Sequence, residues 1–287
     1  MEAAVTTLLN ALTLIGILSL VGLGLTISFG LMNVTNLAHG EFLTIGAYAV
    51  YYTQALGGSF WLGLATAPLA AAVAGFALEW LILRHLYEKP LAAILATWGA
   101  SLVIQQSLEL IFGLGGKPVV PPVQGTFDLG LVAYPAYRIV LIVIAAITLG
   151  LVLLLVRRTS FGLDIRTVIQ DKTMAEAVGI NTRRTYAIAF AFGAAIAGLA
   201  GALVSPLGTV LPQMGVGYLA NAFFVVIVGG AGSVAGLVAG SAFIGGLTSV
   251  LNYQISPSLA QAVVLLFAII MVRIRPTGLV SIAGAVR

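Results

Sequence analysis

The feature that most constrains this chain is its series of long, nearly uncharged apolar runs. Of its 287 residues, 60% are hydrophobic and only 8% are charged, whereas a soluble domain carries roughly 25% charged residues. A surface so poor in charge cannot face water, so lipid must surround most of it. Lipid offers backbone groups no partners and therefore permits only helices or closed barrels. Because the runs are continuous and do not alternate, we predict an all-α integral membrane protein.

We predict one transmembrane domain, residues 1–287, built as a polytopic bundle of about eight or nine helices, some of them broken. The predicted spans are residues 5–31, 40–56, 61–83, 91–112, 136–156, 185–204, 217–228, 234–251 and 259–272. The seventh is short for a crossing, which needs about 20 residues. No basic segment precedes the first run, so we expect a retained span and no signal peptide. The 34 glycines indicate close helix packing, and those in the first span favour a kink or break there.

The basic residues indicate which end of the bundle faces the cytoplasm. Ten of the 13 Lys and Arg residues lie in residues 84–89, in residues 157–184 and at Arg273 and Arg275. Alternating spans place all of these on one side, which the positive-inside rule makes cytoplasmic. We therefore expect the N-terminus and a periplasmic loop, residues 114–135, on the outside. The net charge of +4 then reports topology, and we expect no nucleic-acid partner.

The cytoplasmic loop 157–184 contains a short predicted helix. Thr173 and Glu176 fit a capping box with Thr173 as the N-cap, and Gly179 suits the residue just after the helix. The apolar residues of this helix are Met174, Ala177 and Val178. A helix of under two turns is not stable alone, so it needs a partner surface. The pattern leaves open the alternative that the segment is a solvated connector whose charges only set topology.

Polar residues also mark the start of the second span, at Asn33, Asn36, His39 and Glu41. Asn36 suits the cap of a helix that begins near residue 37, and Glu41 would lie in its first turn, where a carboxylate complements the helix dipole. Ionisable residues in membrane segments are functional candidates, so we predict that these residues line a translocation pathway or its gate. The alternative is that His39 lies at the membrane interface and Glu41 only caps. No His-Glu-x-x-His motif is present, and we predict no metal site.

The fourth span carries polar residues at every fourth position. They are Thr97, Ser101, Gln105 and Glu109. At 3.6 residues per turn this spacing gives one polar stripe along the helix. Such a stripe should face the bundle or a water path and avoid lipid. We interpret it as the lining of a pathway for a polar or zwitterionic solute; hydrogen bonding to neighbouring helices is the alternative.

Motifs of catalysis are missing from the sequence. It has no phosphate loop of the GxxxxGK[ST] kind and no GxSxG nucleophile elbow. The absence of cysteine excludes thiol nucleophiles, disulfides and thiolate metal sites. We predict that the chain is not an enzyme and holds no cofactor, and that any ATP is bound by another chain.

Several segments resemble one family of transport proteins. Residues 176–181, EAVGIN, are similar to the "EAA…G" coupling loop of ATP-binding-cassette importer permeases. Residues 30–42, GLMNVTNLAHGEF, resemble the early segment of the permeases for branched-chain amino acids, most closely the high-affinity, first-permease type. Residues 161–166 and the glycine run 229–240 also resemble that family, so the resemblance spans nearly the whole chain. Urea-type permeases are close relatives.

The resemblance implies a permease subunit of an ATP-driven importer for branched-chain or related amino acids in the bacterial inner membrane. It implies two cytoplasmic ATPase subunits that bind ATP and Mg, a second permease that is a paralogue or a copy, and a periplasmic substrate-binding protein. The short helix would dock on an ATPase and couple its closure to alternating access. The residues implied in coupling are Thr173, Met174, Glu176, Ala177, Val178, Gly179, Ile180, Asn181, Arg183 and Arg184. A permease for urea, short amides or other small organic acids, and a stand-alone channel or carrier, remain open alternatives.

A glycine-rich stretch follows the seventh span. Its glycines are Gly229, Gly230, Gly232, Gly236 and Gly240. The last three repeat at the spacing of a small-xxx-small packing seam, and the first two break the helix before it. We predict helix packing within the chain; an interface with the second permease and exposure of backbone to the pathway are the alternatives.

Overall fold

A computed structural model describes residues 2–32, 35–128, 130, 132–230, 232–275 and 278–280. These residues form eleven α-helices, two short 3-10 helices, η1 (Leu83–His85) and η2 (Ser205–Leu207), and one two-stranded hairpin. The predicted all-α membrane class is therefore confirmed. Asn33, one of the predicted pathway residues, lies outside the described residues.

Seven of the helices in the described part of the chain are long and apolar enough to cross a membrane. They are α1 (Glu2–Met32), α3 (Phe60–Leu81), α4 (Pro90–Phe112), α5 (Ala136–Arg158), α8 (Thr182–Val204), α10 (Val234–Gln254) and α11 (Pro257–Ile274). The second and seventh predicted spans are also helices, α2 (His39–Ala55) and α9 (Met214–Gly229), with 17 and 16 residues. A full crossing takes about 20 residues, so both are short. Helix α1 is one continuous helix, so the first span is not broken; the kink that its glycines favour stays a prediction.

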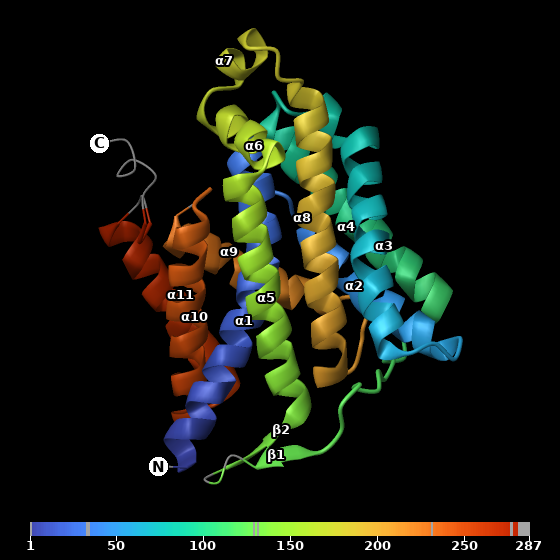
Figure 1. Ribbon diagram of the computed structural model, residues 1–287, viewed down its shortest axis with the longest axis vertical. Helices are drawn as coiled ribbons and strands as arrows, with labels where there is room; N and C mark the ends of the chain where they lie inside the picture. The colour runs from blue at the N-terminus through green and yellow to red at the C-terminus, as the bar shows by residue number, and fades with distance from the viewer. Residues whose placement is uncertain are drawn as a thin grey trace.

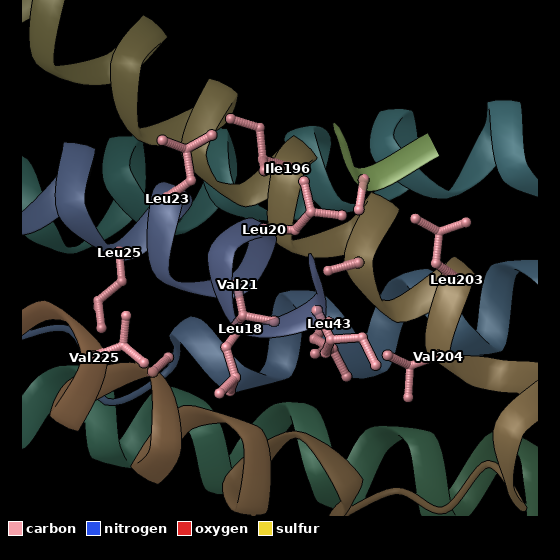
Figure 2. Close-up of a cluster of buried hydrophobic side chains, with 14 of the residues drawn as sticks. Leu18, Leu20, Val21, Leu23, Leu25, Leu43, Ile196, Leu203, Val204 and Val225 are labelled. Atoms are coloured by element: carbon pink, nitrogen blue, oxygen red, sulfur yellow. The ribbon is translucent and has the colours of Figure 1, made fainter. Parts of the chain in front are cut away.

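Helices α1 and α8 form the centre of the bundle. Of the residues in their most apolar stretch, 61% are buried in α1 and 67% in α8, against 17% in each of α4, α5 and α11. Helix α1 packs against α8, α9 and α10, and α8 packs against α2 and α3 (Figure 1). Figure 2 shows the resulting core, in which leucines on successive turns of α1 lie close to side chains of α2, α8 and α9. Its labelled residues are Leu18, Leu20, Val21, Leu23, Leu25, Leu43, Ile196, Leu203, Val204 and Val225.

The two ends of the bundle differ in structure. Helices α6 (Ser160–Gln170) and α7 (Lys172–Ala177) lie at the upper end in Figure 1, where α5 leads into them and α8 leaves. The N-terminus of α1 and the hairpin of β1 (Thr126–Asp128) and β2 (Ala133–Pro135) lie at the lower end. The strands are antiparallel, with Phe127 opposite Tyr134. The basic loop thus forms two helices, and the loop before α5, at the other end, contains a short hairpin.

Candidate functional site

Helix α2 begins deep inside the bundle. Nε2 of His39, its first residue, lies 3.1 Å from the carbonyl oxygen of Val21 in α1. Because a carbonyl only accepts, this ring nitrogen donates. Val21 lies 11 residues before the end of α1 at Met32, which is about 16 Å at 1.5 Å per residue. The chain therefore turns back into the membrane before α2 starts.

A close crossing with α9 fixes this start. A Cβ placed on Gly40 would lie 2.5 Å from the carbonyl oxygen of Gly215, and one on Gly215 would meet the carbonyl of Gly40. The hydroxyl of Thr44 accepts a hydrogen bond of 3.1 Å from the amide of Gly215. Only glycine permits backbones to approach so closely. The two short helices therefore begin against each other within the protein.

Glu41, in the first turn of α2, is bound by the polar stripe of α4. Its side chain is 1% exposed. Oε1 accepts hydrogen bonds from Oγ of Ser101 at 2.8 Å and from Nε2 of Gln105 at 2.7 Å. Thr97 accepts a hydrogen bond of 3.2 Å from the backbone amide of Leu37. Three residues of the predicted stripe thus converge on the start of α2.

The fourth stripe residue, Glu109, does not join this group. Its Oε2 accepts a hydrogen bond of 3.2 Å from Nε2 of Gln106, and the pair lies toward the end of α4 that is remote from α7. Ser101, in contrast, is the central residue of α4, with 11 residues on either side. The group around Glu41 is therefore close to the middle of the membrane-spanning region.

Several polar atoms in α2 and just before it are buried without a hydrogen-bond partner among the described residues. They are Nδ2 of Asn36, Nδ1 of His39, Oε2 of Glu41 and the hydroxyl of Tyr48. An unpaired buried polar atom costs about 1–3 kcal/mol. The group includes both a donor, Nδ2 of Asn36, and an acceptor, Oε2 of Glu41. It is chemically suited to water or to a solute that carries both donors and acceptors.

The predicted cap at Asn36 is wrong in its position. The helix starts at His39, and no side chain caps it. Oδ1 of Asn36 instead accepts a hydrogen bond of 3.0 Å from the backbone amide of Ala38, which closes the turn before the helix. The first amide groups of α2 and their partial positive charge thus lie beside the carboxylate of Glu41.

The segment between α5 and α8 contains α7, the predicted short helix. The predicted N-cap at Thr173 is wrong, because Oδ1 of Asp171 accepts the hydrogen bond from the amide of Met174 at 3.0 Å. Glu176 does not close a capping box, since it accepts a hydrogen bond of 2.7 Å from the hydroxyl of Thr182. The predicted helix stop is present: Gly179 has a φ of +90°, the left-handed conformation that a helix end favours.

The apolar residues Met174 and Ala177 of α7, and Val178 directly after it, are turned away from the protein. Met174 is 60% exposed and Val178 67% exposed, and Ala177 is exposed beside them. Ala175 alone is buried and anchors the helix. Arg183 and Arg184, two of the residues implied in coupling, are exposed. Oδ1 of Asn181 caps α8 by accepting from the amide of Arg184 at 3.0 Å. Ile180 is half-buried, and its amide donates to the carbonyl of Ala175.

One contact that sequence reasoning missed connects this region to α4. The hydroxyl of Tyr87, just before α4, donates a hydrogen bond to the buried carboxyl of Glu79 in α3. The ring of Tyr87 lies 4.8 Å from that of Tyr186, in the second turn of α8. Burial and this hydrogen bond raise the pKa of Tyr87 above its ordinary value, so the hydroxyl remains a donor at neutral pH. A lone carboxylate in an apolar span, such as Glu79, is the signal that could have revealed it.

A second missed group lies at the other end of the bundle. Oδ1 of Asn10 accepts hydrogen bonds from Nη1 of Arg138 at 2.6 Å and from the hydroxyl of Tyr134 at 3.0 Å. These residues lie between α1, α5 and the hairpin, beside a cavity of about 800 Å³ that Thr13 and Ser249 also border. The cluster ties the hairpin to α1.

The glycine seam packs α9 against α10 within the chain. Cβ atoms on Gly229 and Gly236 would each collide with the backbone of the other, and one on Gly240 would collide with the carbonyl of Val225. Gly230 and Gly232 have φ values of +108° and +79° in the connection between the helices. The seam is therefore covered by α9 and does not form an open face for a second subunit.

The family model described as "Branched-chain amino acid transport system / permease component" matches residues 7–273. The chain belongs to this family. The match includes α2, the stripe of α4 and α7, so the family predicted from the sequence is confirmed. It is a family of transport permease subunits, and the chain is accordingly a multi-pass membrane protein.

Two curated relatives align with nearly the full length of this permease, and a third aligns with part of it. It is 26% identical to the high-affinity branched-chain amino acid transport system permease protein LivH of Escherichia coli (strain K12), over 95% of this chain and 94% of LivH. It is 26% identical to BraD of Pseudomonas aeruginosa, over 96% and 94% of the two chains. A third relative, the permease protein LivM of Escherichia coli (strain K12), is 28% identical over 73% of this chain and 55% of LivM. No solved structure matches the chain.

Proposed function

We propose that this permease is the transmembrane subunit of an ATP-driven importer for branched-chain or related amino acids in a bacterial inner membrane. The observation that carries the proposal is the family match, which extends over both the buried polar group of α2 and the exposed α7. The proposed substrate class is the one for which the relatives LivH, BraD and LivM are named. The chain binds no nucleotide in this proposal; ATP and Mg are held by partner chains.

The polar group at the start of α2 is the proposed gate or solute contact. An amino acid carries a carboxylate and an ammonium group, which need donors and acceptors respectively. The buried donor on Asn36 and the free carboxylate oxygen of Glu41 supply one of each. Broken helices that start at mid-membrane present such groups to solutes in transporters. Helix α2 is short and starts inside the bundle, which fits that arrangement.

Helix α7 is the proposed contact to an ATPase. Its exposed Met174, Ala177 and Val178 would bury in an apolar groove, and Glu176, Arg183 and Arg184 would form the polar rim. Burial of a Met or Val side chain contributes about 1.5–3 kcal/mol. The structure of α7, with one buried anchor and an outward apolar face, supports a docking role over a solvated connector.

Tyr87, Tyr186 and Glu79 provide a proposed mechanical link between these two sites. Tyr186 belongs to the helix that leaves α7, and Tyr87 leads directly into α4. A displacement of α7 by the ATPase would therefore reach α4, whose Ser101 and Gln105 bind Glu41. This connection would carry ATPase closure to the gate and switch access between the two sides.

The remaining partners follow from the family. We propose two ATPase subunits on the α7 side, a second permease chain, and a substrate-binding protein that docks on the hairpin side around residues 114–135. The positive-inside rule supports this orientation, because ten of 13 basic residues lie in residues 84–89, residues 157–184 and the C-terminal segment. The N-terminus would then be outside and the C-terminus inside.

Uptake by the assembled transporter tests the proposal. The chain would be reconstituted in liposomes with its proposed ATPases, second permease and binding protein. Uptake of labelled leucine, urea and phenylalanine would be compared with and without ATP. ATP-dependent leucine uptake is expected. ATP-dependent uptake of urea alone would reassign the substrate class, and equal uptake by this chain alone without ATP would identify a channel or carrier instead.

A further inference from the structure

A cavity at the end of the bundle that carries α7 is bordered both by cations and by exposed aromatic rings. It has a volume of about 520 Å³ and lies between the end of α3, η1 and the start of α8 (Figure 1). Three guanidinium groups form its basic rim, those of Arg84, Arg183 and Arg184. The rings of Phe76 and Trp80 form an apolar part of its wall.

The positive charge of the basic rim is not balanced within the cavity. Of the residues that the structure describes, Glu79 alone brings a carboxyl group to the wall, and this group accepts a hydrogen bond from the hydroxyl of Tyr87. Nε of Arg84 donates to Nε2 of His85 at 3.4 Å, which leaves its terminal amino groups for another acceptor. Guanidinium groups bind phosphate with paired, charge-assisted hydrogen bonds. The rim is therefore suited to an anion, and to a phosphate in particular.

Helix α3 carries an exposed apolar stripe that ends at the cavity. Its members are Leu69, Val73, Phe76 and Trp80, all of them exposed. Spacings of four, three and four residues place these side chains on one face of the helix. The 11 residues from Leu69 to Trp80 correspond to about 16 Å, and the hydrocarbon half-thickness is about 15 Å. The stripe thus has the length of the acyl region of one leaflet.

Trp80 and Arg84 connect the apolar stripe to the basic rim. The guanidinium carbon of Arg84 lies 4.7 Å from the centroid of the Trp80 ring, within the range of a cation–π contact. Tryptophan is enriched at the membrane–water interface, so the pair marks the depth at which headgroups meet acyl chains. A ligand at this depth would contact guanidinium groups and an apolar helix face at the same time.

We propose that the cavity binds the headgroup of an anionic phospholipid, with the phosphate at Arg84 and Arg183 and an acyl chain along the stripe of α3. Water or a soluble anion would fill the basic cavity and leave the apolar stripe uncovered. An ATPase in the cytoplasm does not reach a stripe that continues into the hydrocarbon as far as Leu69. The cavity lies on the side with most of the basic residues, and the cytoplasmic leaflet is the one that attracts such residues through its anionic lipids.

The bound headgroup would connect two helices beside α7. Arg84 follows α3, whereas Arg183 lies in the first turn of α8, directly after the segment that contains α7. A phosphate shared by the two side chains would hold the start of α8 against the end of α3. Arg183 also belongs to the rim that we propose for the ATPase contact. Arg84 does not, and it is therefore the residue that tests lipid binding by itself.

Quenching of tryptophan fluorescence by brominated phospholipids tests this assignment. The chain has three tryptophans, so Trp61→Phe together with Trp98→Phe leaves Trp80 as the reporter. The full chain would be reconstituted in vesicles that contain brominated phosphatidylglycerol or brominated phosphatidylcholine, each compared with unbrominated lipid. We expect phosphatidylglycerol to bind beside Trp80 about fivefold more strongly than phosphatidylcholine, or more, since each arginine near an anionic surface contributes about that factor.

Trp61 supplies a matched control for position. It lies at the other end of α3 and is 50% exposed, against 48% for Trp80. A variant that keeps only Trp61 should show no preference between the two lipids. Arg84→Gln should remove the preference at Trp80. Arg158→Gln, at the exposed end of α5, removes a charge on the same side of the membrane and should retain it.

Several results would overturn the inference. Equal quenching of Trp80 by the two lipids would do so, as would the same preference at Trp61. If inorganic phosphate at constant ionic strength abolished the preference, the cavity would belong to a soluble anion. If Trp80 were protected from both lipids in the complete transporter, the stripe would belong to a partner chain. Because quenching is measured without ATP or solute, each of these results leaves the proposed function intact.

Discussion

The start of α2 and helix α7 invert the usual placement of side chains in opposite ways. Around α2, a carboxylate, an imidazole and an amide are buried at membrane depth, and some of their atoms have no hydrogen-bond partner in the part of the chain that the structure describes. On α7, a methionine and a valine are exposed on a loop rich in charge. The two inversions lie at opposite ends of the proposed coupling route, where a solute and an ATPase would supply the missing contacts.

The comparison shows that stability alone does not account for either site. An apolar residue at position 41 would avoid the cost of a buried carboxylate, and a polar residue at position 178 would suit water better. Local rules are broken most often at functional sites. The following predictions test whether each inversion serves transport, in order of decreasing expected effect.

The largest effect is expected from removing the carboxylate at the start of α2. Glu41→Ala would leave Ser101 and Gln105 without their acceptor, and hydrogen bonds to charged groups contribute about 1.5–3 kcal/mol each. We expect ATP-dependent leucine uptake to fall by roughly 10- to 100-fold or more, measured in proteoliposomes at equal permease abundance. Ser101→Ala, which removes one donor, should cost less. Unchanged uptake by Glu41→Ala would show that the buried group serves packing only.

The next effect tests the exposed apolar face of α7. Val178→Asp would place a charge where we propose burial against the ATPase, at a cost of about 1.5–3 kcal/mol or more, so ATPase binding should weaken by roughly 10- to 100-fold. Co-purification of the ATPase with the permease and leucine uptake would measure this. Gln170→Asp, on the exposed end of α6, is the matched control. Equal ATPase binding by both variants would make α7 a solvated connector.

A smaller effect is expected from breaking the link between the two sites. Tyr87→Phe removes the hydrogen bond to the buried carboxyl of Glu79 but keeps the ring contact with Tyr186. We expect leucine transported per ATP hydrolysed to fall by about three- to tenfold, the equivalent of roughly 1 kcal/mol. ATPase binding should be unchanged, which distinguishes this variant from those in α7. A proportional fall in uptake and hydrolysis would contradict a coupling role.

The smallest effect concerns the cap of α7. Asp171→Ala removes the side chain that accepts from the amide of Met174, and loss of an N-cap costs about 1 kcal/mol. Thr173→Ala should have little effect, since Thr173 does not cap. Uptake of the two variants, compared at equal abundance, measures the difference. A larger loss with Thr173→Ala would restore the capping box that the sequence pattern favours.

Helix α7 shows what a local sequence pattern can and cannot predict about a short helix. Thr173 and Glu176 have the spacing of a capping box, but Asp171, two residues earlier, also carries a capping side chain. Glu176 is instead held by Thr182. The choice between the two caps depends on how α7 meets the start of α8, so the sequence could predict a capped helix near residues 173–178 and could not select its first residue.

The sequence alone determined that the chain forms a helical membrane bundle. A chain with 8% charged residues must satisfy its backbone internally in lipid, as a helix bundle or a closed barrel, and its continuous, non-alternating apolar runs exclude the barrel. It also determined which face of α4 is polar, because periodicity is a local property of a helix. Only the tertiary structure decided what that face binds and at what depth. The start of α2 is set by the contact of Gly40 and Thr44 with Gly215, about 170 residues later in the chain, and no local pattern reports a partner so distant.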